Sequence, residues 1–185
     1  MIVFNNITDE EHKEELKGML LAHYKEYFGP EWSDKIPIKS IRDRLSSAKE
    51  GADHAIDLLY NKPNGNNVAF GIYEENTLIG IILLTVHVRK LSDEEEDIYG
   101  ELYHLYIKPE YRKTFIEGTK KEEFIREVNS FVESYFKENE VSDILAAIPS
   151  EIDYLVECGK ELGFEKKKDL PNGIGIQDAL WEKHI

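Results

Sequence analysis

Four cations lie where a predicted strand gives way to a loop and a helix. Arg112, Lys113, Lys120 and Lys121 follow the apolar stretch Leu102–Ile107. Guanidinium and ammonium groups near a helix start can hold a phosphate, because the first helical amides also point outward without backbone partners. The alternative is that these side chains are ordinary solvated residues at the start of a helix. The sequence therefore contains a candidate anion site and leaves its use open.

Cysteine and histidine usage argues against redox and metal chemistry. Cys158 is the single cysteine, so no internal disulfide can form. No cluster of Cys and His has the spacing of zinc ligands. We therefore expect no metal, and we expect the protein to work in a reducing cytoplasm.

The acidic balance of the chain argues against two classes of partner. Among 185 residues, 37 are acidic and 23 are basic, which gives a formal charge of −14. This charge opposes binding to phosphate backbones and to anionic lipids, so we expect neither a nucleic acid nor a membrane as partner. No stretch approaches about 18 consecutive apolar residues, and no signal peptide is recognisable. The length and the 41% hydrophobic content predict one domain over residues 1–185.

The N-terminal part is expected to be helical. Thr8 as N-cap and apolar residues at helical spacing predict a helix from about Asp9 to Tyr27. The stretches Ile38–Ala48 and Ala52–Tyr60 have weaker helical periodicity and are separated by Gly51. This pattern predicts a broken helical hairpin.

A loop and an antiparallel hairpin should follow. Turn-forming residues predict a loop over Asn61–Asn67. Val68–Tyr73 and Leu78–Val88 are rich in β-branched and aromatic residues and are joined by a short polar turn, which indicates two antiparallel strands. The acidic run Ser92–Asp97 is interpreted as a solvated connection, with recognition of a cationic substrate as the alternative.

The C-terminal half should alternate strands and helices. Leu102–Ile107 is predicted as a core strand that runs into a ligand-facing loop, and Lys120–Lys137 as a helix. Asp143–Ile148 should be a buried strand, followed by a helix capped by Ser150. Gly163 should end that helix in the left-handed conformation. The last two predicted strands are Phe164–Leu170 and Gly175–Trp181.

This order of elements and two local sequences resemble the GNAT-type N-acetyltransferases over most of the chain. LYIKPEYR is similar to the family's fourth strand and its V-x-P-x-Y-R continuation, and GKELGF is similar to the end of the helix before the sixth strand. The resemblance implies an α/β fold with a mixed central sheet of about six to seven strands flanked by helices. It also implies acyl transfer from acetyl-CoA, as acyl-donor substrate, to a small-molecule amine or a protein amine.

The resemblance also implies where the acyl donor binds. In this family the loop after the fourth strand has the pattern Q/R-x-x-G-x-G/A and cradles the diphosphate of acetyl-CoA with main-chain amides. Here the pattern starts at Arg112, and Phe115 and Glu117 stand where the family has glycine, so the motif is degenerate. Gly118 follows one residue late. The implied cofactor-binding residues are Leu105, Tyr106, Ile107, Arg112, Lys113, Thr114, Phe115, Ile116, Glu117 and Gly118.

A catalytic base is implied at Glu101. An amine must be neutral to attack a thioester, and a carboxylate can take its proton. Glu101 matches the strand position that carries a base glutamate in some members of the family, although a polar residue at a strand end is an equal alternative. His104 should point to the opposite face, since strand side chains alternate, unless a bulge intervenes. We therefore prefer Glu101 to His104.

The general acid of the family is missing from its usual place. Many members have a tyrosine four residues before the Gly-Phe pair, where its hydroxyl protonates the departing thiolate. Gly159 occupies that place here, and Tyr154 is the candidate to replace the missing tyrosine. Packing is the alternative role for both Tyr154 and Cys158.

Two hypotheses about function follow from these features. The first is an N-acetyltransferase whose negative charge favours a cationic acceptor. The second is a catalytically inactive member of the fold that senses a ligand or binds a protein, which the missing glycines and tyrosine favour. Exposed edge strands near the C-terminus, with Trp181 among charged neighbours, also leave dimerisation across a two-fold axis open.

Overall fold

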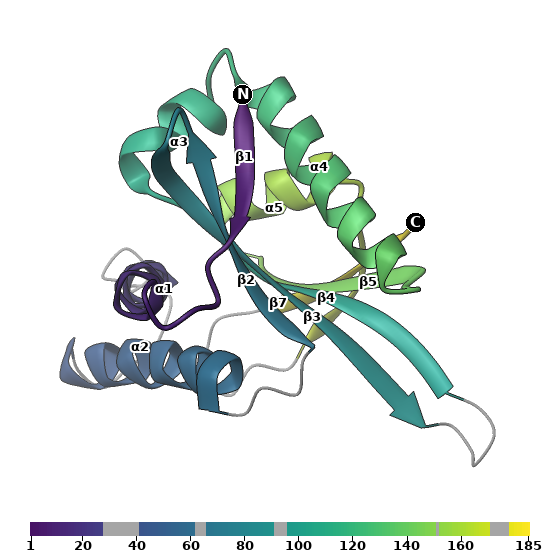
Figure 1. Cartoon of the computed structure of the whole chain (residues 1–185), viewed down its shortest axis with the longest axis horizontal. Helices are drawn as coiled ribbons and strands as arrows, with labels where there is room; N and C mark the ends of the chain where they lie inside the picture. Colours follow the sequence, from purple (N-terminus) through teal and green to yellow (C-terminus); the bar gives the residue numbers. More distant parts are fainter. Residues whose placement is uncertain (28–40, 62–65, 91–95, 151, 171–177) are drawn as a thin grey trace.

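The computed structural model describes residues 1–27, 41–61, 66–90, 96–150, 152–170 and 178–185. Its centre is a seven-stranded sheet in the order β1-β2-β3-β4-β5-β7-β6 (Figure 1). Neighbouring strands are antiparallel except β4 and β5, which are parallel. The predicted α/β fold with a mixed sheet of six to seven strands is therefore confirmed.

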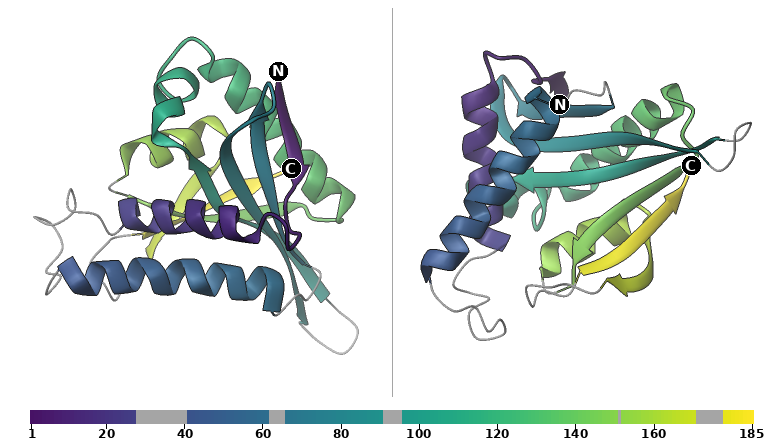
Figure 2. Two further views of the ribbon diagram at one scale, coloured as in Figure 1. Left: turned by 60° about the vertical axis from the view of Figure 1, so that its left-hand side comes forward. Right: turned by 90° about the horizontal axis from the view of Figure 1, so that it is seen from below.

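Helices cover both faces of this sheet. The strands are β1 Ile2–Asn6, β2 Asn67–Glu74, β3 Thr77–Lys90, β4 Glu96–Ile107, β5 Asp143–Pro149, β6 Glu165–Leu170 and β7 Asp178–His184. The helices are α1 Lys13–Tyr27, α2 Ile41–Ile56 with a π turn η2 Asp57–Asn61, α3 Pro109–Phe115, α4 Lys121–Glu138 and α5 Asp153–Glu161. In Figures 1 and 2, α1 and α2 lie on one face and α3, α4 and α5 on the other. Each face buries its own apolar cluster.

Several predicted elements are confirmed with small shifts of their bounds. The hairpin is formed by β2 and β3, and the predicted helix Lys120–Lys137 is α4. Gly163 ends α5 with φ 84°, the left-handed conformation that glycine adopts at low cost. The loop predicted over Asn61–Asn67 and the acidic run Ser92–Asp97 lie mostly outside the described residues, as does the start of the strand predicted over Gly175–Trp181, whose described part belongs to β7.

Gly51 does not break the second helical region. It lies inside α2, so the predicted helical hairpin is wrong. A Cβ atom at this position would lie 2.7 Å from Cε1 of Tyr24 on α1. The glycine therefore permits close packing of the two helices, which the local sequence could not distinguish from a helix break.

Two predicted helix caps are also wrong. The Thr8 hydroxyl bonds to the backbone of Ala69 on β2, and Asp9 accepts the bond from the His12 amide before α1. Ser150 does not cap α5, which begins at Asp153, and its hydroxyl is buried without a hydrogen-bond partner in the part of the chain that the structure describes. In addition, β1 was not predicted, because five residues give too little periodicity to recognise a strand.

Strands β4 and β5 touch along a short distance and then diverge. Within the described ranges they pair at Gly100 with Ile144 and at Glu101 with Leu145. The right-hand view of Figure 2 shows β5 and β7 leaving β4 at a wide angle. Beyond Glu101, the edge of β4 that faces β5 therefore lacks a neighbouring strand in the described part of the chain.

A β-bulge in β4 changes the direction of its side chains. His104 lies opposite Leu83 and Leu102 lies opposite Leu84, so Tyr103 is an extra residue without a partner on β3. Glu101 lies opposite Thr85.

No helix among the described residues is long and apolar enough to span a membrane.

Candidate active site

The bulge brings Glu101 and His104 to the same face of the sheet. Their opposite residues on β3, Thr85 and Leu83, are two apart and therefore share a face. The expectation from simple alternation, that these side chains point apart, is wrong because Tyr103 adds one residue to the count. This is the face covered by α1 and α2.

Glu101 is held by a histidine that the sequence analysis did not select. Its Oε2 atom lies 2.7 Å from Nε2 of His87 on β3, and both side chains are partly exposed. The imidazole ring stacks on Tyr99, with 4.8 Å between the ring centroids. Glu101 therefore has a fixed position near the point where β4 and β5 separate.

His104 belongs to a cluster of aromatic side chains between α1 and β4. Its Nε2 atom lies 2.8 Å from the hydroxyl of Tyr24, and its ring lies edge-on to His23 at 4.9 Å. Burial raises the pKa of Tyr24 and of Tyr103 and holds the pKa of His104 well below 6.5. At neutral pH the histidine is therefore uncharged and the phenols keep their protons.

His23, on α1, is buried in the same cluster. Burial, with a smaller contribution from the positive charge of Arg112, lowers its pKa from 6.5 to about 4. The folded protein thus holds His23 neutral, whereas the unfolded chain takes up a proton below pH 6.5.

The protein is expected to lose stability as the pH falls from 6.5 to 4. In this window the unfolded state binds a proton at His23 and the folded state, in which its pKa is about 4, does not, which costs roughly 3 kcal/mol. Melting temperatures across this window should fall less steeply for His23→Leu than for the wild type. His54→Leu, at an exposed position on α2, is the matched control and should keep the wild-type slope. Equal slopes for the wild type and His23→Leu would contradict this account.

The segment predicted as a phosphate-binding loop is partly helical. Pro109 starts α3 and Phe115 ends it, with the Phe115 side chain buried against Phe124. A loop is therefore the wrong description of this stretch, because proline at the first helical position and a buried phenylalanine stabilise a helix. Gly118 has a packing role: a Cβ atom there would lie 2.4 Å from the carbonyl oxygen of Lys113. Thr114 and Glu117 are exposed and Ile116 is buried.

Three of the four cations near this segment form ion pairs with carboxylates. Lys120 pairs with Glu74. Lys121 lies 2.7 Å from Glu157 and 2.9 Å from Glu161, and these contacts raise its pKa. A phosphate would have to compete with these carboxylates for the same ammonium groups.

Arg112 joins three elements at the ends of β4 and α1. Its Nε atom donates to the carbonyl of Ile107 at 2.9 Å, and its Nη2 atom lies 2.5 Å from Glu26 on α1. The guanidinium also lies over the ring of Tyr154 on α5, at 4.6 Å, and near the ring of Tyr106. Arg112 and Tyr154 are thus brought together, away from Glu101 along β4.

Gly159, at the position where many GNAT-type members have a tyrosine, packs closely against β5. A Cβ atom at Gly159 would lie 2.5 Å from Cδ1 of Ile148 on β5, so a larger residue requires Ile148 to move. Burial raises the pKa of the neighbouring Cys158 thiol to about 12, which makes it a poor nucleophile. The hydroxyl of Tyr154, whose pKa is also raised by burial, stays protonated at neutral pH.

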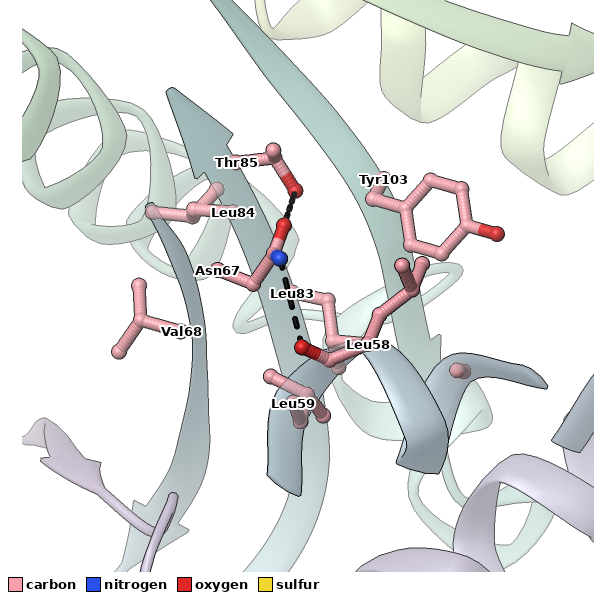
Figure 3. Close-up of a pocket in the computed structure, with 9 residues that line it drawn as sticks. Leu58, Leu59, Asn67, Val68, Leu83, Leu84, Thr85 and Tyr103 are labelled. Carbon is pink, nitrogen blue, oxygen red and sulfur yellow. Dashed lines mark hydrogen bonds between the residues drawn. The ribbon is translucent and has the colours of Figure 1, made fainter. Parts of the chain in front are cut away.

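A small pocket lies beside Glu101 on the α1 and α2 face. Its volume is about 10 Å³, room for roughly one water molecule. Figure 3 shows Asn67 in its wall, where it accepts from the Thr85 hydroxyl at 2.9 Å and donates to the carbonyl of Leu58 at 3.4 Å. The other lining residues are Ala55, Leu59, Val68, Leu83, Leu84 and Tyr103. The pocket therefore has one polar side, formed by Asn67 and by Thr85, the residue that lies opposite Glu101 on β3.

The described residues hold no group of three or more His, Cys, Asp or Glu side chains that could bind a metal.

Sequence reasoning missed His87, Tyr24 and Glu26 as members of the site. The contacts of Tyr24 and Glu26 cross 80 and 86 positions of the chain, so no local spacing could reveal them. His87 could have been found, because a hairpin places it near Glu101 once the strand register is known.

Comparison with known proteins identifies the fold. No family model and no curated protein matches the chain. Among solved structures, the PaiA N-acetyltransferase from Thermoplasma acidophilum in complex with coenzyme A has a TM-score of 0.67 and 18% identity, covering 100% of this chain and 99% of that one. Spermidine N-acetyltransferase from Vibrio cholerae in complex with CoA and spermine has a TM-score of 0.59 and 15% identity, covering 99% and 95%.

A further similar structure carries the family name. It is from Desulfovibrio desulfuricans, is assigned to the GNAT family of acetyltransferases, and has a TM-score of 0.59 and 12% identity over 100% of this chain and 99% of that chain. The mixed sheet, the parallel contact of β4 with β5 and the helices on both faces agree with these likenesses. The chain therefore has the fold of the GNAT-type N-acetyltransferases.

Proposed function

We propose that the protein transfers an acyl group from acyl-CoA, with acetyl-CoA as the expected donor, to an amine acceptor. The observation that carries the proposal is the separation of β4 from β5 after Glu101. In an antiparallel ladder, alternate residues of β4 direct their N–H and C=O groups away from β3. That free edge suits the amide-containing arm of CoA, which can pair with it as an added strand does.

The residues near this edge have the chemistry that the reaction needs. Glu101 is proposed to take a proton from the acceptor ammonium, so that the neutral amine attacks the thioester. The Tyr154 hydroxyl is proposed to protonate the departing thiolate. Because Tyr154 contacts Arg112 away from Glu101, this role requires α5 to shift towards Glu101. Leu105, Tyr106 and Ile107 offer the strand edge, and Arg112 and Lys113 the positive charge near it.

The acceptor is proposed to be a cationic amine. The protein carries a formal charge of −14, which attracts cations over long distances. The spermidine N-acetyltransferase from Vibrio cholerae, a protein of similar fold, was solved with CoA and spermine. A polyamine and a lysine-bearing peptide are therefore the first acceptors to test.

A second function is favoured by the ion pairs around α3. Glu26, Glu74, Glu157 and Glu161 neutralise three of the cations that a diphosphate would need. A member of the fold that has lost turnover and senses a ligand or binds a protein would tolerate this neutralisation. The two functions differ in whether CoA binds and whether thiol is released.

The proposal is tested by ligand-induced stabilisation and by thiol release. A ligand that binds the folded state at 100 times its Kd adds about 2.7 kcal/mol to the free energy of unfolding. We expect acetyl-CoA to raise Tm, and we expect free CoA thiol to accumulate when a polyamine or peptide amine is added. The absence of any Tm shift at millimolar acetyl-CoA would refute the enzyme, and a shift without turnover on any amine would favour the inactive alternative.

Glu26→Gln is expected to tighten CoA binding. Removing the carboxylate frees the Arg112 guanidinium for phosphate, a gain of about 1 kcal/mol or roughly fivefold in Kd. Titration calorimetry at low salt measures the change. Glu15→Gln, an exposed position on α1, removes the same charge without touching Arg112 and should leave Kd within twofold.

A double variant, Glu26→Gln with Arg112→Ala, tests whether the tighter CoA binding depends on Arg112. Glu26→Gln should have no effect in an Arg112→Ala background, because the freed guanidinium is then absent. Weaker CoA binding by Glu26→Gln than by the wild type would contradict the proposed competition.

A further inference from the structure

His87 and Glu101 form a contact across neighbouring strands on the face that holds the candidate base. His87 lies opposite Tyr99 and Glu101 lies opposite Thr85, so the two side chains are diagonal neighbours on the β3 and β4 ladder. The 2.7 Å contact between Nε2 and Oε2 uses one oxygen of Glu101. The stacked ring of Tyr99, 16° from parallel, fixes the plane of the imidazole.

The exposure of this pair matters for a proton transfer. The His87 side chain is 35% exposed and that of Glu101 is 28% exposed, so the imidazole contacts both the carboxylate and solvent. A carboxylate that has accepted a proton must lose it before the next turnover. Imidazole is the side chain best suited to accept and release a proton near neutral pH.

Among the described residues, the neighbouring Arg89 and Tyr103 do not offer a better route for this proton. Arg89, two residues further along β3, pairs with Asp97 at 2.5 Å, so both are occupied with each other. Tyr103, two residues after Glu101 on β4, is partly buried, and burial raises the pKa of its hydroxyl.

The contact between His87 and Glu101 contributes little to stability, because an exposed ion pair is worth no more than about 1 kcal/mol.

We infer that His87 is a positioning residue of the acyl transfer, which holds Glu101 and carries the proton of Glu101 to solvent. This inference rests on the proposed function and on Glu101 as its base. The acceptor ammonium gives one proton to Glu101, the amine nitrogen bonds to the thioester carbonyl carbon, and the C–S bond breaks. The Tyr154 hydroxyl, the acid proposed above, protonates the departing thiolate, and the second proton of the nitrogen restores that hydroxyl. The products are the amide and the CoA thiol, and the first proton passes from Glu101 to His87 and then to water.

The test compares two substitutions of His87. His87→Gln keeps a donor for the Glu101 carboxylate but cannot carry a proton, and His87→Ala removes both functions. We expect both variants to lose about tenfold or more in kcat with little change in KM for the amine. Exogenous imidazole should restore part of the kcat of His87→Ala, because the site is open to solvent.

Three results would overturn the inference. They are wild-type kcat in His87→Ala, wild-type kcat in His87→Gln, and no effect of imidazole on an impaired His87→Ala. Arg89→Ala, on the same strand, is the matched control and should keep wild-type kcat. Failure of the proposed function is a separate result, because the wild type itself would then release no thiol with any amine.

Discussion

Glu101→Gln is expected to lower kcat for acyl transfer by about 10²- to 10⁴-fold, the usual contribution of a general base. Glutamine has the same size as glutamate, and its amide oxygen can still face Nε2 of His87, so the fold should be kept. CoA binding should be nearly unchanged, since the proposed base does not hold the donor. Steady-state rates of thiol release, with CoA affinity measured in parallel, check both statements.

His104 is the rival base that the bulge makes credible. It shares the face of Glu101, but burial keeps its pKa well below 6.5, which makes it a weak proton acceptor, and Tyr24 occupies its Nε2 atom. His104→Gln should therefore reduce kcat less than Glu101→Gln does. A larger loss of kcat in His104→Gln than in Glu101→Gln would identify His104 as the base. A kcat of Glu101→Gln within twofold of the wild-type value would show that Glu101 is not the base.

Lys183→Ala is expected to lower the free energy of unfolding by about 3 kcal/mol. Lys183 on β7 is 9% exposed, and its ammonium lies 2.6 Å from Glu133 on α4 and 2.8 Å from the carbonyl of Leu162. Asn129 also accepts from it. Removing Lys183 leaves the partly buried carboxylate of Glu133 with only the longer Lys137 contact and the Asn129 bond, and it takes this donor from the Leu162 carbonyl, which costs more than the loss of an exposed pair. Chemical denaturation followed by circular dichroism measures the change.

Lys137 supplies a matched control on the same carboxylate. It lies 3.4 Å from Glu133 and is 56% exposed, so Lys137→Ala should cost less than about 1 kcal/mol. The hydrogen bond from Lys183 lowers the pKa of Glu133 below 4.5. The part of the stabilisation that comes from the Glu133 carboxylate is therefore complete above pH 4.5 and is lost as the pH falls through the lower, folded-state pKa. Equal costs for the two lysines, or a Lys183→Ala deficit that does not shrink in strong acid, would contradict this account.

Much of the fold could be predicted because its longer elements follow simple periodicities. The helix α4 and the hairpin of β2 and β3 were recognisable from apolar spacing, and Gly163 from its position after a helix. The errors fall where local signals have two meanings. Gly51 reads as a break but permits close packing on Tyr24, and the stretch after Ile107 reads as a loop but forms α3.

The candidate site was predictable in part. The resemblance singled out Glu101, Arg112 and Tyr154, and the structure places Arg112 and Tyr154 in contact. Their proposed roles stay predictions. Glu26, which engages Arg112, could not be predicted, because nothing in the local sequence of α1 indicates a partner 86 residues away.

The sequence by itself determined that this chain forms a mixed α/β sheet and that its best chemical candidates follow the apolar strand ending at Ile107. Hydrophobic periodicity and turn residues act over a few positions, so they are legible without a structure. The tertiary structure alone decided which way those candidates point and what holds them. One extra residue, Tyr103, turns Glu101 and His104 to the same face, and carboxylates from three other elements occupy the cations. Strand register and long-range ion pairs depend on the packing of the whole sheet and its helices, which no local pattern encodes.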